Sequence, residues 1–491
     1  MDAKSAVKEL QEKGYMVTAE AFEKITNSNN PEELARAAMK CAGEKTIIDL
    51  SCFDIVEKGK DILKEKKVEI EYTEFKPTAK EYETRLKVLS GANMGIESTG
   101  KVENFVNYFR DRYTQISQMY ASRGGNSLVP LNKLKLKKNV RTRIIGIVSE
   151  KRTTKNGHIL LNVEDLDCEQ NVLIPSSNKK LIEYAGSLVD DEVICIDGRM
   201  SSELYIADSI SQPDMPIKQP KKIEEDIALL TTSDMHIGSK MFVQNSFEKF
   251  IRWLAGKEGD EKQRELAGKV KYVSIAGDLV DGIGIYPGQE SELDILDIFA
   301  QYDAFEKYLE QIPDYVQVII SPGNHDAVRN ADPQPVIPED LLRKSYKMSN
   351  VTLVGSPATV SVHGINTLIY HGTSFDDIIA RVPAASYEKS ESPLIECLKR
   401  RHLHPIYGGK PITPSVTDTL VINEIPDIFH AGHIHKNGYD IYRGVTCINS
   451  GTFQQITPYQ VKQGHKPTPG IVPVVELKNG KIRVMHFDKD E

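Results

Sequence analysis

Five short stretches of this 491-residue sequence each end an apolar run with side chains that can bind a metal ion. The stretches are TTSDMHIG, KYVSIAGDLVDG, VQVIISPGNHD, INTLIYHG and PDIFHAGHIH. Their candidate residues are Asp234, His236, Asp278, Asn324, His325, His371, His433 and His435. Apolar runs of this length predict buried strands. Ligands of open α/β sheets bind beyond the carboxyl ends of the strands, so we expect these side chains to converge on one site.

The residue types indicate a binuclear metal site. Two divalent ions about 3.5–4 Å apart need imidazole nitrogens, a carboxylate that can bridge, and an open position for water or substrate. Glycines at 277, 323, 372 and 432 would let the chain turn sharply and let neighbouring loops approach closely. A single histidine at a strand end is more often a hydrogen-bonded core residue. Five such stretches in order, each with its glycine, favour the metal site.

The motifs D-x-H, G-D-x-x-D, G-N-H-D, H-G and G-H-x-H resemble those of the calcineurin-like metallophosphoesterases. The resemblance implies two groups of metal ligands that share one bridging carboxylate, Asp278. One group is Asp234, His236 and His435, and the other is Asn324, His371 and His433.

The same resemblance gives the next two residues roles other than metal binding. His325 would face the phosphate and stabilise charge or protonate the leaving oxygen, and Asp326 would orient its imidazole. The histidine-rich ligand set favours two Mn²⁺ ions, with Zn²⁺, Fe²⁺ or Ni²⁺ as alternatives and Mg²⁺ alone as a poor fit. Such ions would lower the pKa of a water for in-line attack on phosphorus.

Four further histidines are interpreted without a role as metal ligands. His363 lies in a predicted hairpin turn and His430 lies inside a predicted strand, so neither is expected to bind metal. His402 and His404 follow a Lys-Arg-Arg run in LKRRHLHPIYGG, where they could contact substrate phosphates. An exposed, charged helix end is the alternative interpretation of this run.

Composition limits the class of protein. An apolar fraction of 40% and a charged fraction of 27% are typical of soluble globular domains. The sequence has no apolar run of membrane-spanning length and no signal-peptide pattern at its start, so we expect a cytoplasmic, nucleoid-associated protein with no membrane partner. The six cysteines lack C-x-x-C spacing and are expected to be free thiols. A net charge of −8 argues against binding nucleic acid over the whole surface.

Residues 1–65 are predicted to form an N-terminal helical docking module. Four amphipathic patterns occur there, and the third has Asn30 as its N-cap and Pro31 at its first helical position. A solubilising accessory bundle is the alternative. Residues 66–130 are predicted to be a tether with one helix at 102–123 and a flexible hinge at its end.

Residues 131–217 are predicted to form an OB-like β-barrel. They contain five short strand patterns, a hairpin at Asn156-Gly157 and one helix-like segment, KKLIEYAG. Basic residues there could follow a DNA backbone; they are Lys133, Lys135, Lys137, Lys138, Arg141 and Arg143. Aromatic residues for stacking single-stranded bases are nearly absent from this segment. A solvated basic face or a protein-binding surface is therefore an alternative.

Residues 218–491 are predicted to form the phosphoesterase domain. Strands alternate with helix-like segments, which predicts a layered α/β/β/α sandwich. The whole chain is therefore expected to be a multidomain α+β protein with an N-terminal helical bundle, an OB-like barrel and a C-terminal four-layer calcineurin-like domain.

This order of domains is similar to that of the small subunits of replicative DNA polymerases, and within them to those of archaeal DNA polymerase D. The stretches that carry this resemblance are SDMHIGSK, AGDLVDGIGIYPGQE, SPGNHDAVR, LKRRHLHPIYGG and INSGTFQQITPYQ. The resemblance implies a 3′–5′ proofreading exonuclease that acts on single-stranded or mismatched DNA 3′ ends. It also implies a heterodimer, or a larger assembly, with a large catalytic subunit that polymerises DNA.

Two other functions are consistent with the same residues. A stand-alone phosphatase or small-nucleotide phosphodiesterase would share every ligand but would not need a barrel or a docking bundle. A structural accessory subunit with a vestigial site would not need the complete ligand set that this chain has.

Overall fold

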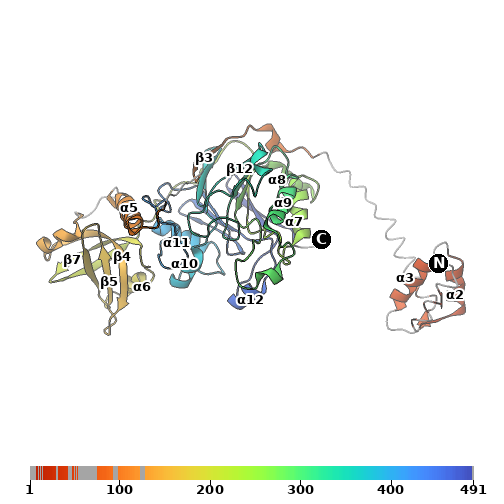
Figure 1. The fold of residues 1–491 in the computed structure, drawn as a ribbon, viewed down its shortest axis with the longest axis horizontal. Helices are drawn as coiled ribbons and strands as arrows, with labels where there is room; N and C mark the ends of the chain where they lie inside the picture. The colour runs from red at the N-terminus through yellow and green to blue at the C-terminus, as the bar shows by residue number, and fades with distance from the viewer. Residues whose placement is uncertain are drawn as a thin grey trace. The chain divides into compact units, whose positions relative to one another are not determined.

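The computed structural model describes residues 75–91, 98–121 and 128–488, together with parts of the segment 7–52. The chain divides into two compact units, Met1–Glu74 and Phe75–Glu491, which are described separately (Figure 1). None of the described helices is long and apolar enough to cross a membrane.

The described residues of the first unit include two helices with assigned bounds and a short parallel strand pair. These are α2 (Ala19–Thr26), α3 (Pro31–Ala42), β1 (Met16–Val17) and β2 (Ile47–Ile48). Thr18 caps α2 by accepting a hydrogen bond from the Ala21 amide, and α3 begins at Pro31 as predicted. The predicted cap Asn30 and nearly all of the predicted fourth helix lie outside the described residues, so the four-helix bundle stays a prediction.

Five strands of the second unit close into a barrel, as the sequence predicts (Figure 1). They are β4 (Arg141–Thr153), β5 (Ile159–Glu164), β6 (Glu169–Ile174), β7 (Val193–Ser201) and β8 (Leu204–Ser211), in the order β4-β5-β6-β8-β7. The predicted helical segment is α6 (Lys179–Gly186), between β6 and β7. Alternating apolar residues such as Val148, Leu161 and Val172 fill the interior. A turn, η2 (Leu131–Lys137), leads into the barrel.

Two six-stranded sheets form the rest of the second unit. The first has the order β12-β11-β10-β9-β18-β19 and the second the order β16-β17-β15-β14-β13-β3. The first sheet contains β9 (Ala228–Thr232), β10 (Val270–Ala276), β11 (Gln317–Ser321), β12 (Val351–Leu353), β18 (Ile471–Glu476) and β19 (Lys481–His486). The second contains β3 (Leu86–Ser90), β13 (Ala358–Val362), β14 (Ile365–Ile369), β15 (Ile428–Ala431), β16 (Asn437–Tyr442) and β17 (Val445–Ser450).

The sheets pack face to face, with helices on the outer side of each. Leu229 and Ile319 from the first sheet share a buried core with Val360 and Ile428 from the second. The opposite face of the first sheet packs against α7 (Gln244–Leu254), α8 (Glu261–Lys269) and α9 (Ile298–Leu309), which lie side by side in Figure 1. The opposite face of the second packs against α10 (Phe375–Arg381) and α11 (Ser392–Arg400). The sequence-predicted layers of helix, sheet, sheet and helix are therefore present.

Short elements complete the unit. They are η1 (Thr78–Glu81), η3 (Gln289–Glu292), η4 (Ser345–Lys347) and α12 (Pro458–Gln463). The last of these, α12, begins with a capping box in which Thr457 and Gln460 bond to each other's backbone amides.

Residues 86–90 lie in the segment predicted as a tether, but they form strand β3 of the second sheet. The tether prediction is therefore wrong for these residues. Strand β3 pairs antiparallel with β13, with Val88 opposite Val360. The reason is tertiary: β3 contains only a short alternating pattern, and its partner lies more than 260 residues later in the chain. The predicted helix is present as α5 (Val102–Ala121).

Helix α5 joins the barrel to the layered domain. Its Arg112 is 1% exposed and donates from Nε to Asp418 Oδ2 at 2.8 Å, and from Nη1 to the Pro405 carbonyl at 2.7 Å. The same Nη1 donates to the carbonyl of Asp191, which lies in the turn before β7. Tyr120 donates to the Ser211 carbonyl at the end of β8. One face of the helix is therefore packed against both parts, and the helix is not part of a loose linker.

Candidate metal centre

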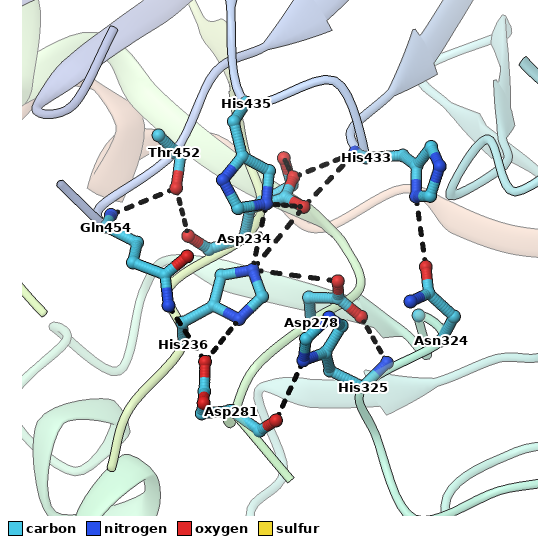
Figure 2. Close-up of polar contacts among 12 residues, drawn as sticks. Asp234, His236, Asp278, Asp281, Asn324, His325, His433, His435, Thr452 and Gln454 are labelled. Atoms are coloured by element: carbon cyan, nitrogen blue, oxygen red, sulfur yellow. Dashed lines mark hydrogen bonds and ion pairs between the residues drawn. The ribbon is translucent and has the colours of Figure 1, made fainter. Parts of the chain in front are cut away.

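The predicted ligands all follow strand ends on the same edge of the two sheets. Strands β9, β10 and β11 are parallel neighbours, and so are β14 and β15, so their carboxyl ends point the same way within each sheet. The residues that follow them are Asp234 and His236, Asp278, Asn324 and His325, His371, and His433 and His435. Figure 2 shows Asp234, His236 and His435 clustered around Asp278, with His433 and Asn324 facing each other beside them. The structure thus brings together every metal ligand predicted from the sequence.

Five of these residues have left-handed backbones, a conformation that non-glycine residues rarely adopt. The φ angles are 52° for Asp234, 51° for His236, 53° for Asp278, 69° for His433 and 60° for His435. Each such residue costs free energy unless its surroundings hold it in place. Clusters of strained residues are typical of functional sites. Here the left-handed backbone conformation directs each side chain toward the centre.

Two predicted glycines are required by close approach. A Cβ on Gly277, which has a φ of 86°, would lie 2.5 Å from the Gly323 amide nitrogen. A Cβ on Gly432 would lie 2.4 Å from Asp234 Oδ2. Any larger residue at either position would push the ligand loops apart.

The first group of predicted ligands is tightly clustered. His236 Nε2 lies 3.0 Å from His435 Nε2, and His435 Nε2 lies 3.3 Å from Asp234 Oδ1. All three side chains are buried. The other ring nitrogen of His236 bonds to Asp281 Oδ1 at 3.0 Å, and that of His435 bonds to Gln460 Nε2 at 2.9 Å. Both imidazoles therefore aim Nε2 at the same point.

The second group has the same compact geometry. Asn324 Oδ1 lies 3.0 Å from His371 Nε2 and 3.0 Å from His433 Nδ1. His371 Nδ1 bonds to the Ala276 carbonyl at 2.7 Å, so it carries the proton and leaves Nε2 as a lone-pair donor.

Asp278 lies between the two groups. Its Oδ2 is 3.7 Å from His236 Nε2 and 3.3 Å from His371 Nε2, while its Oδ1 accepts a hydrogen bond from the His325 amide at 2.8 Å. This is the position that a bridging carboxylate requires.

The electrostatics of the centre favour an ionised Asp278. Burial favours its neutral form, but the imidazoles of His371 and His325 hold its pKa well below the ordinary 3.8. Burial lowers the pKa of His371, yet the neighbouring Asp278 carboxylate raises it to about 10. The centre therefore binds positive charge strongly, as protons or as metal ions.

The residues present fit two divalent ions. Ligands about 2.1 Å from one ion and at right angles to each other lie about 3 Å apart, which matches the spacings within each group. Ligand atoms of Asp234, His236, Asp278 and His435 all lie within 4.8 Å of one another. His236 and His435 also place two nitrogens 3.0 Å apart, a spacing that a shared cation stabilises.

His325 is placed beside the ligands without joining either group. Its Nδ1 donates to the Asp281 carbonyl at 2.8 Å, and its ring lies edge-on to His236 at 4.6 Å between centroids. Its other nitrogen, Nε2, is therefore the atom left for a substrate.

The prediction that Asp326 orients the His325 imidazole is wrong. Asp326 points away from His325 and accepts hydrogen bonds from the Gly323 amide at 2.8 Å and the Tyr302 hydroxyl at 3.1 Å. Adjacent residues in this loop project to opposite sides, so Asp326 fixes the loop backbone. Burial and the nearby Asp278 raise the pKa of Asp326 to about 7.

Asp281 does what was expected of Asp326, and sequence reasoning missed it. Its Oδ1 holds His236 Nδ1, and its carbonyl holds His325 Nδ1 (Figure 2). Gln454 and Gln289 donate to the two carboxylate oxygens of Asp281 at 2.8 and 2.9 Å. The signal was present in the sequence, since Asp281 is the second aspartate of G-D-x-x-D.

Asp376 is a second missed residue. It lies in the first turn of α10, and its Oδ2 contacts His433 Nε2 at 3.2 Å and Lys410 Nζ at 2.9 Å. Although burial favours the neutral form, His433 and Lys410 hold the pKa of Asp376 far below its ordinary value. No short motif marks it, because its partners lie far away in the sequence.

A pocket of about 420 Å³ opens onto the centre. It is lined by six predicted site residues, His236, Asp278, Asn324, His325, His433 and His435, by Asn330, and by side chains from the segments 281–286, 376–410 and 454–465. This volume lies within the range of small-molecule sites, about 300–1,000 Å³.

Comparison with known proteins places the chain in a family. The sequence profile of the B subunits of DNA polymerases alpha and epsilon matches residues 229–438, a segment that includes all seven predicted ligands. A DNA polymerase II small subunit from Methanocaldococcus jannaschii is 43% identical over 408 residues, covering 81% of this chain and 68% of that protein. The corresponding protein from Archaeoglobus fulgidus is 37% identical over 498 residues, covering 99% of both chains. This chain belongs to the archaeal DNA polymerase II small subunit family. The resemblance to the small subunits of archaeal replicative DNA polymerases is thereby confirmed.

The basic residues of this polymerase small subunit are only partly free to bind DNA. Lys133, Lys135, Lys137, Lys138 and Arg141 are exposed on η2 and at the start of β4, and Arg143 is half-buried. Three of the six pair with carboxylates; the pairs are Lys135–Glu203, Arg141–Asp208 and Arg143–Asp197. A role in DNA binding stays a prediction for this surface.

Of the four further histidines interpreted from the sequence, two match their predicted places and two do not. His363 lies in the β13–β14 turn with a φ of 48°, and His430 lies inside β15, bonded to Ser274 and Ser450. His402 and His404 are buried, so they form neither an exposed helix end nor a phosphate contact. They bond to Asp418 and Asp332 at 2.8 and 2.9 Å. The two histidines are buried because they form hydrogen bonds with buried carboxylates.

Proposed function

We propose that this polymerase small subunit carries a two-metal 3′–5′ exonuclease, in a calcineurin-like domain, and associates with a large polymerising subunit. The observation that carries the proposal is the shared position of Asp278 between two compact ligand groups, 3.7 Å from His236 Nε2 and 3.3 Å from His371 Nε2. A lone structural ion would need only one such group. Mn²⁺ suits the mixture of imidazole, carboxylate and amide ligands best.

Two bound divalent ions would supply Lewis-acid charge at the phosphate and a water of lowered pKa. The chain's own residues then perform the remaining tasks. Asp278 would set the separation of the two ligand groups. Asp281 holds His236 through its side chain and His325 through its carbonyl, which fixes both rings against each other.

His325 is the residue proposed to assist the leaving 3′-oxygen. With Nδ1 donating to the Asp281 carbonyl, a protonated ring presents Nε2–H to the pocket. From there it can stabilise negative charge on the departing oxygen or transfer the proton to it.

Two observations weigh against the alternative functions. Family membership favours a polymerase assembly over a stand-alone phosphatase. The complete ligand set, with its strained backbones and hydrogen-bonded imidazoles, argues against a vestigial site, because those features cost stability and serve no evident packing purpose.

The proposal is tested by measuring digestion of a 5′-labelled single strand with Mn²⁺ and metal content by mass spectrometry. The wild-type chain is expected to bind about two ions and to shorten the strand from its 3′ end. Asp278→Asn is expected to lose detectable hydrolysis and to lower occupancy of both ions, because one carboxylate serves both. Asp303→Asn, an exposed aspartate on α9, is the matched control and should change neither.

Two results would contradict the proposal. One is full nuclease activity with two ions in Asp278→Asn. The other is digestion from the 5′ end, which a 3′-blocked strand would reveal by remaining a substrate.

A further inference from the structure

Two pairs of aromatic rings line the pocket beside the metal centre. Tyr286 and Tyr459 stack with centroids 5.3 Å apart and an interplanar angle of 20°. Tyr387 and His465 lie 4.3 Å apart at 36°. These four residues, here called the aromatic patch, come from the loop before η3, the loop before α11, and α12 with the residues that follow it.

Hydrogen bonds hold two of the rings in place by their hydroxyl groups. The Tyr286 hydroxyl donates to Glu292 Oε2 at 3.0 Å, and the Tyr387 hydroxyl donates to Asp376 Oδ1 at 2.9 Å. Asp376 also contacts His433 at the centre, so Tyr387 is linked to a predicted ligand through one side chain. Anchoring the polar ends leaves the ring faces for contact with a planar group.

The patch exposes apolar surface next to a polar centre. Tyr459 is 48% exposed and the adjacent Ile285 is 37% exposed. Apolar surface in water is unfavourable, by roughly 25 cal/mol per Å², and grouping it at a pocket is typical of a binding site.

Positive charge does not explain how a nucleic acid would enter this pocket. Among the described residues that line it, Lys410 is the only lysine or arginine, and its ammonium group is already paired with Asp376 at 2.9 Å. Three carboxylates, those of Asp278, Asp281 and Asp376, also line the pocket. Apart from bound ions, the ring faces are the main attraction that the pocket offers to a nucleotide.

We propose that the aromatic patch stacks unpaired bases at the 3′ end of a single strand while the phosphodiester lies at the metal centre. This inference rests on the proposed nuclease function and adds to it a base-binding subsite beside the metal centre. Every base has a π-face, so stacking tolerates sequence. A paired terminus must first unpair to bring its bases into a pocket of about 420 Å³, so mismatched ends are preferred.

The test combines a ring deletion with a base deletion on the full chain. Tyr459→Leu removes the most exposed tyrosine of the patch, and Tyr459→Phe keeps its ring. Tyr439→Leu is the matched control, because Tyr439 is 46% exposed on β16 but does not line the pocket. Each protein is assayed on single strands that end in thymidine or in an abasic nucleotide.

Wild type, Tyr459→Phe and Tyr439→Leu are expected to favour the thymidine terminus through a lower KM. Tyr459→Leu is expected to raise KM for that terminus by about 5- to 100-fold, with a much smaller change for the abasic terminus. Equal effects of Tyr459→Leu on both termini would overturn the inference, since a structural role would not distinguish them.

A binding measurement separates this inference from the nuclease proposal. A strand with 2-aminopurine at its 3′ end should lose fluorescence on binding, because stacking on tyrosine quenches it. Quenching that needs Tyr459 in a chain that does not cleave DNA would support the stacking site and refute the nuclease. Cleavage with quenching independent of Tyr459 would do the opposite.

Discussion

Asp281 is the residue on which the geometry of the centre most depends after the ligands themselves. It accepts hydrogen bonds from His236 through its side chain and from His325 through its backbone carbonyl, and Gln454 and Gln289 hold it in turn. A carboxylate in this position fixes the tautomer of His236 and makes Nε2 a better ligand. Asp281 is therefore a positioning residue for one group of ligands.

We expect Asp281→Asn to weaken metal affinity or activity by about 10- to 100-fold, because a neutral amide replaces the carboxylate behind His236. Titrating Mn²⁺ against the cleavage rate measures this, and excess Mn²⁺ should restore most of the rate. Asp294→Asn, an exposed aspartate nearby in the chain, is the control. A lower maximal rate with unchanged Mn²⁺ affinity would show that Asp281 does not act through the metal ligand.

Replacing His325 should change the cleavage rate without changing the metal content. Its ring donates to the Asp281 carbonyl, only its backbone amide bonds to Asp278, and it belongs to neither predicted ligand group. His325→Ala should therefore keep both ions but lose about 10²–10⁴ in cleavage rate, the usual contribution of an acid or charge stabiliser. Metal content and single-turnover rate should be measured on the same sample. A parallel fall in both would make His325 a ligand.

At the scale of elements, α5 and the segment 400–418 form a buried polar seam. Asp418 accepts hydrogen bonds from Arg112 and His402, both at 2.8 Å, and all three side chains are at most 2% exposed. Burial and the nearby Arg112 lower the pKa of His402 to about 4. The Arg112 and His402 contacts hold the pKa of Asp418 well below 3.8 despite burial. The seam therefore holds a neutral histidine beside an ion pair.

This arrangement predicts a loss of stability in weak acid. The pKa of His402 is about 4 when folded and 6.5 in its unperturbed state, so the unfolded chain binds more protons between these values. Stability should fall as pH drops from about 6.5 toward 4. At pH 5 the loss from this group is of order 2 kcal/mol.

Urea unfolding at pH 7 and pH 5 measures the effect. His402→Gln should be less stable at pH 7 but should lose less stability between pH 7 and pH 5 than wild type does, because the group that gains a proton is gone. His486→Gln is a suitable control, since His486 lies on the exposed edge strand β19. An unchanged pH dependence in His402→Gln would show that His402 is not the titrating group.

At the scale of the whole molecule, the proposed function would bring an acidic chain to acidic DNA. The net charge is −8, and three of the six predicted DNA-contacting residues on the barrel are engaged in ion pairs. Non-specific attraction to duplex DNA is therefore weak. We infer that the large subunit holds the duplex and transfers the frayed 3′ end to the metal centre.

This hand-over predicts different behaviour of the isolated chain and the complex. Alone, the chain should digest single strands and mismatched ends slowly and with a steep salt dependence. With its large partner, it should digest them much faster and prefer mismatched over paired termini. Rates on matched and mismatched primers across a salt series test this. Equal rates and equal salt slopes with and without the partner would contradict the hand-over.

The sequence by itself predicted the five barrel strands, the strands that precede the candidate metal ligands, and the convergence of those ligands on one edge of the sheets. Each ligand follows an apolar run that is recognisable from a few neighbouring residues, and parallel strands bring such ends to one edge. The five barrel strands and α6 could also be predicted, because alternating apolar residues and turn residues are local signals.

Only the tertiary structure decided which residues support the site. Asp376 contacts His433 from a helix 57 positions earlier in the chain. Strand β3 pairs with β13, although the whole barrel lies between them in the sequence. His402 looked exposed because its neighbours are basic, yet a buried aspartate accepts its hydrogen bond. The aromatic patch likewise combines three segments that are separated in the sequence. Such contacts join residues distant in sequence, so no local pattern can encode them, and only the packed chain brings them together.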